Sequence, residues 1–355
     1  MCSSGGISNL MLSRRASLRY GSRAWAGLAV VSALALVGPG AAGHAPEAHP
    51  AWPPPPAEPC IVYVRSFTGP ADLGIKPPAL SRFAGWLTGS GRGPSRLEKP
   101  FGLTLDEAGD LLITDTAAGM VCCLDHTGKK WLHWEQAGKT RFASPVAVAR
   151  RGDTVLVADS GLGKVLALDL KGKLLFEIGR ELERPSGLAI SGERLYITDA
   201  QRHQVVVCSL RGEVLSRFGH RGSGPGEFNY PTHVAVDAAG RLLVTDSMNC
   251  RIQVFTPSGE FQGTIGSPGD VPGTFSRPKG VAADRAGHLY VVDALFDNVQ
   301  IFDGQGRLLL HWGETGSEPG QFWLPNGIAI SAGNDIYVAD SYNHRIQVFK
   351  YTGKQ

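Results

Sequence analysis

Short apolar runs separated by turn residues dominate the chain, and the clearest example lies between Leu324 and Gly353. In that stretch, clusters of Ser, Gly, Asn and Asp separate three β-rich runs, Ile328–Ile330, Ile336–Ala339 and Arg345–Phe349. None of the runs shows the 3.6-residue period of a helix, whereas short runs bounded by turn residues are typical of strands. The stretch therefore predicts three short strands joined by tight turns.

The same unit recurs along the chain in a fixed register. Each copy opens on a proline, at Pro100, Pro145, Pro185, Pro231, Pro278 and Pro325. The second run of each copy closes on an aspartate, at Asp115, Asp159, Asp199, Asp246, Asp293 and Asp340. By subtraction of their residue numbers, these aspartates are 44, 40, 47, 47 and 47 residues apart. Repeats of this length with several strands are typical of propeller blades, so six copies predict an all-β, six-bladed β-propeller.

The first five copies have a fourth run after their third turn. These runs are Lys129–Trp134, Lys173–Gly179, Glu213–Gly219, Glu260–Gly266 and Arg307–Gly313. The sixth copy ends at Tyr351–Gln355 without one, but Cys60–Phe67 matches the other fourth runs in length and in its closing aromatic residue. We therefore expect the N-terminal strand to complete the sixth blade and close the ring, so that no blade keeps an unpaired partner.

The repeats resemble NHL repeats, which form the blades of six-bladed propellers. The resemblance covers about Pro100–Gly353 and is strongest in YPTHVAVDAAGRLLVTDSMNCRIQVF, RPKGVAADRAGHLYVVDALFDNVQIF and LPNGIAISAGNDIYVADSYNHRIQVF. The linkers GSGPGEF, GDVPGTF and GSEPGQF follow the same pattern. The first two copies depart from it, because DTAAGMVCCL and DSGLGKVLAL lack the Asn and Arg of DSYNHRIQV. The resemblance implies the fold and leaves the ligand open.

Residues 1–43 lie outside the repeats and have the pattern of an export signal. Arginines precede an apolar run at Ala26–Val37, and Ala41–Gly43 is a small-residue cleavage site. The pair Arg14 and Arg15 also resembles a twin-arginine signal. The alternative is an uncleaved anchor in the inner membrane, from which the propeller would still be exported. We therefore expect a periplasmic or extracellular protein.

Two further segments stand apart from the blades. His44–Pro59 is rich in Pro and Ala and predicts a polyproline II spacer, so the predicted propeller spans residues 60–355. Thr68–Lys99 is longer than the other connections between blades. Within it, apolar residues at i, i+3, i+4 and i+7 predict one short amphipathic helix at Ala79–Leu87. Its apolar stripe would pack on the propeller or, alternatively, contact a partner or a membrane.

The net charge and the cysteines bear on two classes of ligand, nucleic acids and metal ions. The chain has 35 basic and 32 acidic residues, and four of the basic ones are arginines within residues 1–43, which leaves a net charge of about −1 without that segment. This balance argues against nucleic acid, which requires a strongly basic surface. The cysteines beyond the signal, Cys60, Cys122, Cys123, Cys208 and Cys250, show no metal-ligand spacing and predict buried free thiols.

The repeated Asp and Gly residues have structural explanations. Six strand-closing aspartates could form a carboxylate ring, but Asp commonly accepts hydrogen bonds from the turn that follows it. Arg251 and Arg345 are also placed to pair with the aspartates of their own copies. Glycines follow four blade-opening prolines, at Gly102, Gly187, Gly280 and Gly327. We expect them to allow close backbone approach where the innermost strands converge on the axis.

In the fourth copy, His233 replaces the glycine found in most other copies. A histidine beside the axis can bind a metal or act as a base. Related propeller lyases and hydrolases hold a metal with several His, Asp, Asn or Glu side chains from different blades. The equivalent positions here cannot ligate through a side chain, since they are Gly102, Ala147, Gly187, Gly280 and Gly327. We therefore predict no catalytic residue, metal or cofactor.

Strand parity gathers the candidate binding residues on one face. In blades of four antiparallel strands, the blade-opening turns and the turns after the second strands share a face. That face carries the predicted binding residues Phe101, Thr232, His233, Lys279, Phe296, Asn326 and Tyr342, with Met248 and Leu295 nearby. Large apolar residues on exposed turns favour a contact surface, and packing between neighbouring blades is the alternative.

The favoured function is an exported binding or scaffolding module of the cell envelope. Its expected partner is a protein, a peptide or an envelope polymer, recognised through shape and apolar contact because the net charge is near zero. A metal-dependent enzyme of the propeller lyase or lactonase type, with its site in the central channel, is the alternative. A sensor ectodomain would require the uncleaved anchor.

Overall fold

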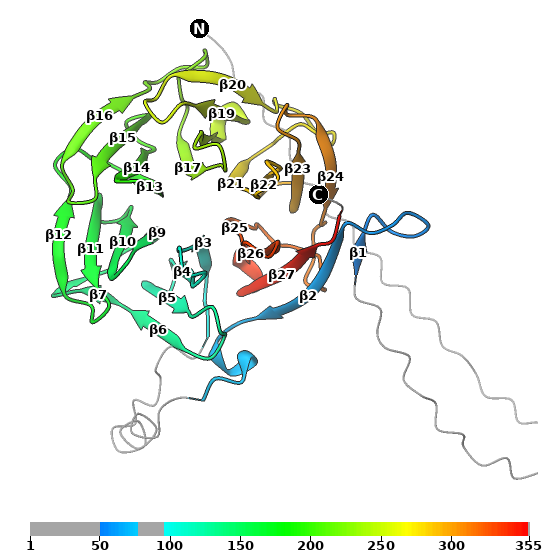
Figure 1. Cartoon of the computed structure of the whole chain (residues 1–355), viewed down its shortest axis with the longest axis horizontal. Helices are drawn as coiled ribbons and strands as arrows, with labels where there is room; N and C mark the ends of the chain where they lie inside the picture. The colour runs from blue at the N-terminus through cyan, green and yellow to red at the C-terminus, as the bar shows by residue number, and fades with distance from the viewer. Residues whose placement is uncertain (1–49, 77–95, 354–355) are drawn as a thin grey trace, which may run out of the picture. The chain divides into compact units, whose positions relative to one another are not determined.

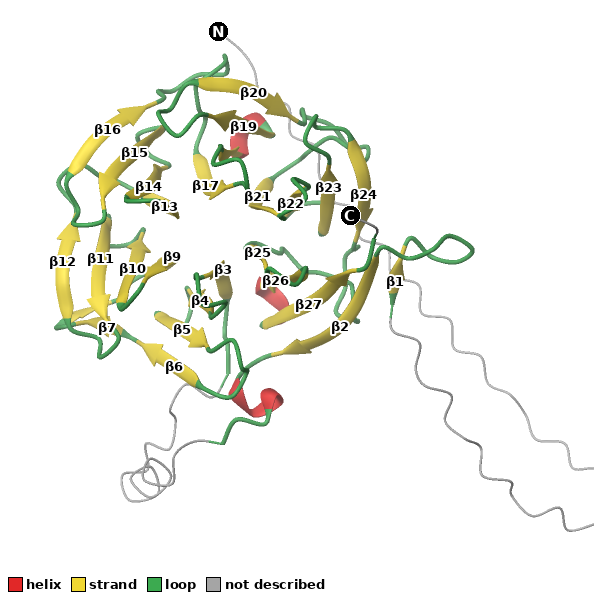
Figure 2. Cartoon of the chain, in the orientation of Figure 1, coloured by secondary structure: helices red, strands yellow, loops and turns green. Residues whose placement is uncertain are grey.

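The computed structural model describes residues 50–76 and 96–353, which form a ring of β-sheets around a central axis (Figure 1). The predicted all-β, six-bladed propeller is confirmed, and the helical residues of the described ranges belong to short 3₁₀ turns (Figure 2). No helix within these ranges is long and apolar enough to cross a membrane. The expected export signal and the predicted helix at Ala79–Leu87 lie outside the described residues.

In the first five blades, four consecutive antiparallel strands run from the axis outward. The first three blades are β3 (Pro100–Leu105), β4 (Leu111–Asp115), β5 (Met120–Leu124) and β6 (Trp131–Trp134); β9 (Pro145–Arg151), β10 (Thr154–Asp159), β11 (Lys164–Asp169) and β12 (Leu174–Ile178); and β13 (Pro185–Ser191), β14 (Arg194–Asp199), β15 (Gln204–Ser209) and β16 (Val214–Phe218). The next two are β17 (Pro231–Val236), β18 (Leu242–Asp246), β19 (Arg251–Phe255) and β20 (Phe261–Ile265); and β21 (Pro278–Ala283), β22 (Leu289–Asp293), β23 (Asn298–Phe302) and β24 (Leu308–Trp312). A small hairpin of β7 (Gln136–Ala137) and β8 (Thr140–Arg141) lies between the first two blades.

The sixth blade joins the two ends of the described chain. Its inner strands are β25 (Ile328–Ile330), β26 (Asp335–Asp340) and β27 (Arg345–Tyr351), and β2 (Ile61–Phe67) pairs antiparallel with β27 (Figure 1). The predicted closure by the N-terminal strand is therefore confirmed. A short fifth strand, β1 (Ala51–Trp52), pairs with β2, in a segment where the sequence predicted a spacer. The ring of Trp52 packs against that of Phe349, 6.0 Å between centroids.

Burial explains why the second and third strands are nearly continuous apolar runs. They are sandwiched between neighbouring blades, and every residue of β4, β5, β18 and β22 is buried. The outer strands face solvent on one side, so β12 and β24 alternate between covered and exposed positions. The core is consequently divided into six apolar clusters, one at each junction between adjacent blades.

The strand-closing aspartates are structural, as predicted. All six are fully buried. Asp115 accepts hydrogen bonds from the backbone N–H groups of Ala117 and Ala118 in the following turn, at 3.1 and 3.0 Å. It also accepts from Glu98 and Lys99, which lead into the first strand of the same blade. Each carboxylate thus ties the entry of its blade to the turn after its second strand.

The NHL-type residues around Asp340 extend this network to the connecting loop. Arg345 donates to the Asp340 carboxylate at 2.8 Å and to the carbonyl oxygens of Glu318 and Gln321 at 3.0 and 2.9 Å. Asp246 and Arg251 repeat the pairing in the fourth blade, also at 2.8 Å. The predicted Asp–Arg pairs are therefore confirmed, and they fix the loop that leads from one blade to the next.

The glycines of the inner strands are required by close packing. A Cβ on Gly280 would lie 2.5 Å from the carbonyl oxygen of Asn326, and one on Gly187 would lie 2.9 Å from that of Thr232. Gly102 and Gly327 face backbone atoms of the neighbouring blade in the same way. The expected close approach near the axis is thus confirmed.

The five cysteines of the described residues are free, as predicted. Cys122, Cys123 and Cys208 are buried, while Cys60 and Cys250 are partly buried. Burial raises the pKa of the Cys123 and Cys208 thiols to about 11, so both are protonated at neutral pH.

Candidate functional site

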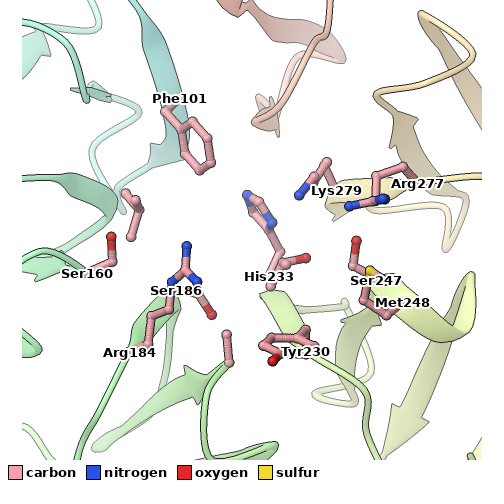
Figure 3. A pocket seen from close by; sticks show the side chains of 13 residues that line it. Phe101, Ser160, Arg184, Ser186, Tyr230, His233, Ser247, Met248, Arg277 and Lys279 are labelled. Carbon is pink, nitrogen blue, oxygen red and sulfur yellow. The ribbon is translucent and has the colours of Figure 1, made fainter.

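A cavity of about 310 Å³ opens beside the axis (Figure 3). Its lining comes from blade-opening segments and from turns after second strands, the two kinds of turn that strand parity places on one face. The lining residues are Phe101, Val146, Ser160, Arg184, Ser186, Ala200, Tyr230, Thr232, His233, Ser247, Met248, Arg277 and Lys279.

The predicted binding residues separate into two groups. Phe101, Thr232, His233 and Lys279 all line the cavity. The remaining three do not. The lining comes from the first five blades, whereas Asn326 and Tyr342 belong to the sixth. Phe296 is on the fifth blade, in the turn after β22, but is not among the lining residues.

Each residue outside the cavity has its own surroundings. Asn326 is buried, and its amide approaches Ser341 Oγ at 3.4 Å. Phe296 is partly buried, and its backbone N–H donates to Asp293 at 3.3 Å. The Tyr342 ring packs 5.8 Å from that of Trp323, and Lys99 Nζ lies 4.4 Å from the Tyr342 centroid. Tyr342 thus belongs to a separate aromatic group.

His233 projects from β17 toward the middle of the cavity (Figure 3). Its ring lies nearly parallel to that of Phe101, 6.4 Å between centroids. Both ring nitrogens are buried and have no hydrogen-bond partner among the described residues, and the same holds for Thr232 Oγ1. Burial and, secondarily, the charge of Lys279 lower the His233 pKa to about 3. At neutral pH the ring is therefore uncharged and offers one donor and one acceptor.

Three cations surround His233, and sequence reasoning identified one of them. Lys279 was predicted, whereas Arg184 and Arg277 were missed. Figure 3 shows all three side chains directed into the cavity. In residues 50–76 and 96–353, none of the three makes a side-chain hydrogen bond or ion pair. Burial and the charges of the two arginines lower the Lys279 pKa to about 8.

The nearest aspartates in the repeat register do not neutralise these cations. Asp199 accepts a hydrogen bond from the backbone N–H of Arg184 at 2.9 Å, and Asp293 accepts one from that of Arg277 at 3.1 Å. Both carboxylates therefore hold the arginine backbones while leaving the guanidinium groups to the cavity. No acidic side chain is among the described residues that line the cavity, so its local charge is positive although the net charge of the chain is small.

A signal for both arginines is present in the sequence. Arg184 and Arg277 directly precede the blade-opening prolines Pro185 and Pro278, at a register position shared by Tyr230. Comparing the residues at that position in all six copies would have identified three basic side chains, Lys99, Arg184 and Arg277, and one aromatic side chain on the binding face. Of the three, Lys99 lies outside the cavity, beside Tyr342.

The described residues of the cavity do not form a metal-binding cluster or a serine–histidine pair. In the described part of the chain, no three His, Cys, Asp or Glu side chains come close enough to share a metal ion. Ser186 Oγ donates to the Pro231 carbonyl at 2.9 Å, and His233 makes no hydrogen bond to it within the described ranges. A serine activated by a histidine base is therefore not assembled here. The arrangement is suited to binding polar and anionic groups.

Sequence comparisons identify the repeats. A model of the NHL repeat matches residues 228–255 and 322–349, and a model of a 6-bladed β-propeller family matches residues 177–241. These matches agree with the resemblance seen in the fourth and sixth copies. A search of curated protein sequences finds no match.

Solved structures share the fold. A streptogramin B lyase superposes with a TM-score of 0.54 at 16% identity, over 71% of this chain and 93% of the lyase. Virginiamycin B lyase from Staphylococcus aureus gives 0.53 at 17% identity, over 72% and 86% of the two chains. Hydrazine synthase of Kuenenia stuttgartiensis gives 0.54 at 15% identity, over 73% and 97%. At these identities the similarity shows the propeller fold alone.

Proposed function

Because the chain is a six-bladed β-propeller that carries NHL repeats, we propose that it is an exported binding module whose axial cavity receives a ligand. The observation that carries this proposal is the set of unsatisfied polar groups in the cavity. Buried polar atoms in folded proteins are usually hydrogen-bonded. The ring nitrogens of His233 and the hydroxyl of Thr232 have no partner in the described chain, and a ligand in the cavity can supply one.

The surroundings of the cavity support a partner larger than the cavity itself. Met248 at its edge is 45% exposed, and Leu295, Trp323 and Tyr342 are exposed by 54, 52 and 40%. These residues follow second strands or precede the opening of a blade, so they share the face of the cavity. Exposed aromatic and apolar side chains are favoured at contact surfaces. We therefore propose a protein, a peptide or an envelope polymer as the partner.

Export is the second part of the proposal, and it is supported by the arginine-flanked apolar run Ala26–Val37. Residues 1–56 fused to a reporter that is active only after export should give an active reporter outside the cytoplasm. An inactive fusion retained in the cytoplasm would remove the envelope from the proposal.

Binding is tested by capture from an envelope fraction on the immobilised full chain. Lys279→Gln removes a cavity cation and should abolish capture, while Tyr342→Ala should weaken capture of a partner that spans the face. Lys171→Gln is the matched control, since Lys171 is exposed on the turn between β11 and β12 and has no ion pair among the described residues. If Lys279→Gln and Tyr342→Ala both recover the same partners with the affinity of the Lys171→Gln control, the cavity face is not the binding site.

A further inference from the structure

The geometry points to an anionic ligand group: we propose that Arg184, Arg277 and Lys279 bind a carboxylate or phosphate in the axial cavity. This inference rests on the proposed function and specifies the chemistry of its ligand. The three cations come from the third and fifth blades, which lie on either side of His233 in the fourth (Figure 3). An anion between them would thus be approached from two sides.

The cations have no ion-pair partner among the described residues, and the opposing effect of the Asp293 carboxylate on Lys279 is outweighed by burial and by the two arginines. Arg184 is exposed at the mouth, while Arg277 and Lys279 are partly buried. Like charges held this close repel one another, and partial removal from water weakens their solvation. The lowered pKa of Lys279 is a direct consequence of both effects. An anion in the cavity would reverse the repulsion and supply the ion-pair partner that the described chain does not provide.

The donor geometry selects oxyanions. A guanidinium group is planar and can donate two parallel hydrogen bonds to a carboxylate or phosphate, and an ammonium group adds a point charge. Elsewhere in this fold, Arg345 shows that one guanidinium group can serve several acceptors at once, since it donates one hydrogen bond to a carboxylate and others to two carbonyl oxygens. Arg184 and Arg277 have equivalent donors with no such partners among the described residues.

The rest of the cavity indicates the body of the ligand. Neutral His233 and the hydroxyl of Thr232 can each hydrogen-bond an uncharged polar group. Phe101 and Met248 supply apolar contact on opposite sides of His233 (Figure 3). A cavity of about 310 Å³ is at the lower end of the usual range for ligand sites. The ligand is therefore a small acid, or one acidic group of a larger chain, attached to a short and partly apolar body.

Methionine provides a probe for this inference. The full chain has four methionines, of which Met248 lines the cavity and Met120 is buried in the core between the first and sixth blades. In protein labelled with ¹³C at the methionine methyls, the signal of Met248 is assigned with Met248→Leu. The protein is then titrated separately with inorganic phosphate and with succinate, at an ionic strength held constant with chloride.

The inference predicts a saturable shift of the Met248 signal and no shift of Met120. Lys279→Gln and Arg277→Gln should each weaken the affinity about tenfold or more, since a hydrogen bond to a charged group is typically worth about 1.5–3 kcal/mol. Lys171→Gln should leave it unchanged. Which of the two anions binds more tightly distinguishes a phosphate ligand from a carboxylate ligand.

The pH dependence adds an independent readout. Affinity for succinate, whose carboxyl groups are already ionised at neutral pH, should fall as the pH rises through about 8, where Lys279 loses its proton in the free protein. The groups that face Lys279 and set this titration are Arg184, Arg277, Asp293 and His233. Lys279→Arg should keep the binding and lose the pH dependence, so the inference stays testable if Lys279→Gln does not fold.

The failure of this inference is distinguishable from that of the proposed function. If neither anion shifts Met248 but an envelope fraction does, the cavity binds a ligand and the inference of an anionic group is wrong. If nothing shifts Met248, both are wrong. Equal shifts in the unmodified protein and in Lys279→Gln would show that the anion binds elsewhere.

Discussion

Truncating the two buried ends of β2 should open the ring, because this strand contributes to two different cores. Ile61 is fully buried among residues of the fifth and sixth blades, and Phe67 is 1% exposed among residues of the sixth and first. Replacing a buried Ile by Ala typically costs about 2–5 kcal/mol, and Phe by Ala about 3–5 kcal/mol. Since the two sites share no cluster, their effects should add to about 5–10 kcal/mol. That sum is comparable to the whole stability of a typical domain.

Val64 is the matched control on the same strand, because its side chain is 43% exposed. Urea unfolding followed by circular dichroism should show Val64→Ala within about 0.5 kcal/mol of the unmodified protein. Each of Ile61→Ala and Phe67→Ala should lower the midpoint strongly, and the double variant should be largely unfolded in buffer. A double variant that unfolds at the same urea concentration as Val64→Ala would refute the closure of the ring by β2.

Three further outcomes follow from the packing and the charges. Arg345→Met leaves the buried Asp340 carboxylate without its ion-pair partner and should destabilise the folded protein by about 3–5 kcal/mol. Arg307→Met is the control, because it removes a pair whose arginine is 77% exposed and should change stability by less than about 1 kcal/mol. Equal effects of the two substitutions in chemical denaturation would contradict the structural role of the NHL-type pair. Gly280→Ala should destabilise the folded protein by about 1–3 kcal/mol and lower its melting temperature, because the added methyl group would meet the backbone of the neighbouring blade. Gly263→Ala is the control and should have little effect on the melting temperature, since its methyl group would meet nothing within 4 Å in the described chain. Because the pKa of His233 is lowered, the folded state binds fewer protons than the unfolded state below about pH 6.5, and stability falls as the pH drops toward about 3. His233→Gln should reduce this fall by at most about 1.4 kcal/mol per pH unit. Identical stability–pH profiles of His233→Gln and the unmodified protein would show that the ring is not buried as described.

The fold could be predicted from the sequence because each blade repeats the same requirements. Every second strand ends on a buried Asp that ties two segments of its blade together. Three inner strands contain a glycine where backbones approach, and a fourth follows directly after one. These constraints act within one repeat or between adjacent repeats, so they recur at a fixed spacing. The missing fourth strand of the last copy then left Cys60–Phe67 as its partner. The pairing of β1 with β2 could not be predicted from the sequence, because Ala51 and Trp52 lie among prolines and do not form an apolar run.

The site was harder to predict because it depends on how far each side chain lies from the axis. Strand parity assigned Met248 and Tyr342 to the same face and the same turn position. It could not show that the cavity lies toward the first five blades, which brings Met248 into its lining and leaves Tyr342 outside. Arg184 and Arg277 were not predicted because they lie just before the inner strands, outside the strand positions that converge on the axis, and only their long side chains reach the cavity. The net charge of the chain gave no sign of a positively charged cavity, since three cations lie together there although the chain as a whole is nearly neutral.

We have proposed that the axial cavity is a ligand site for an anionic group. The most direct measurement is the anomalous diffraction of selenium in crystals of the chain soaked with selenate, a tetrahedral oxyanion. We expect one ordered selenium peak in the cavity, within hydrogen-bonding distance of Arg277 and Lys279, and its loss in crystals of Lys279→Gln. An empty cavity with selenate bound only on the outer surface would contradict it.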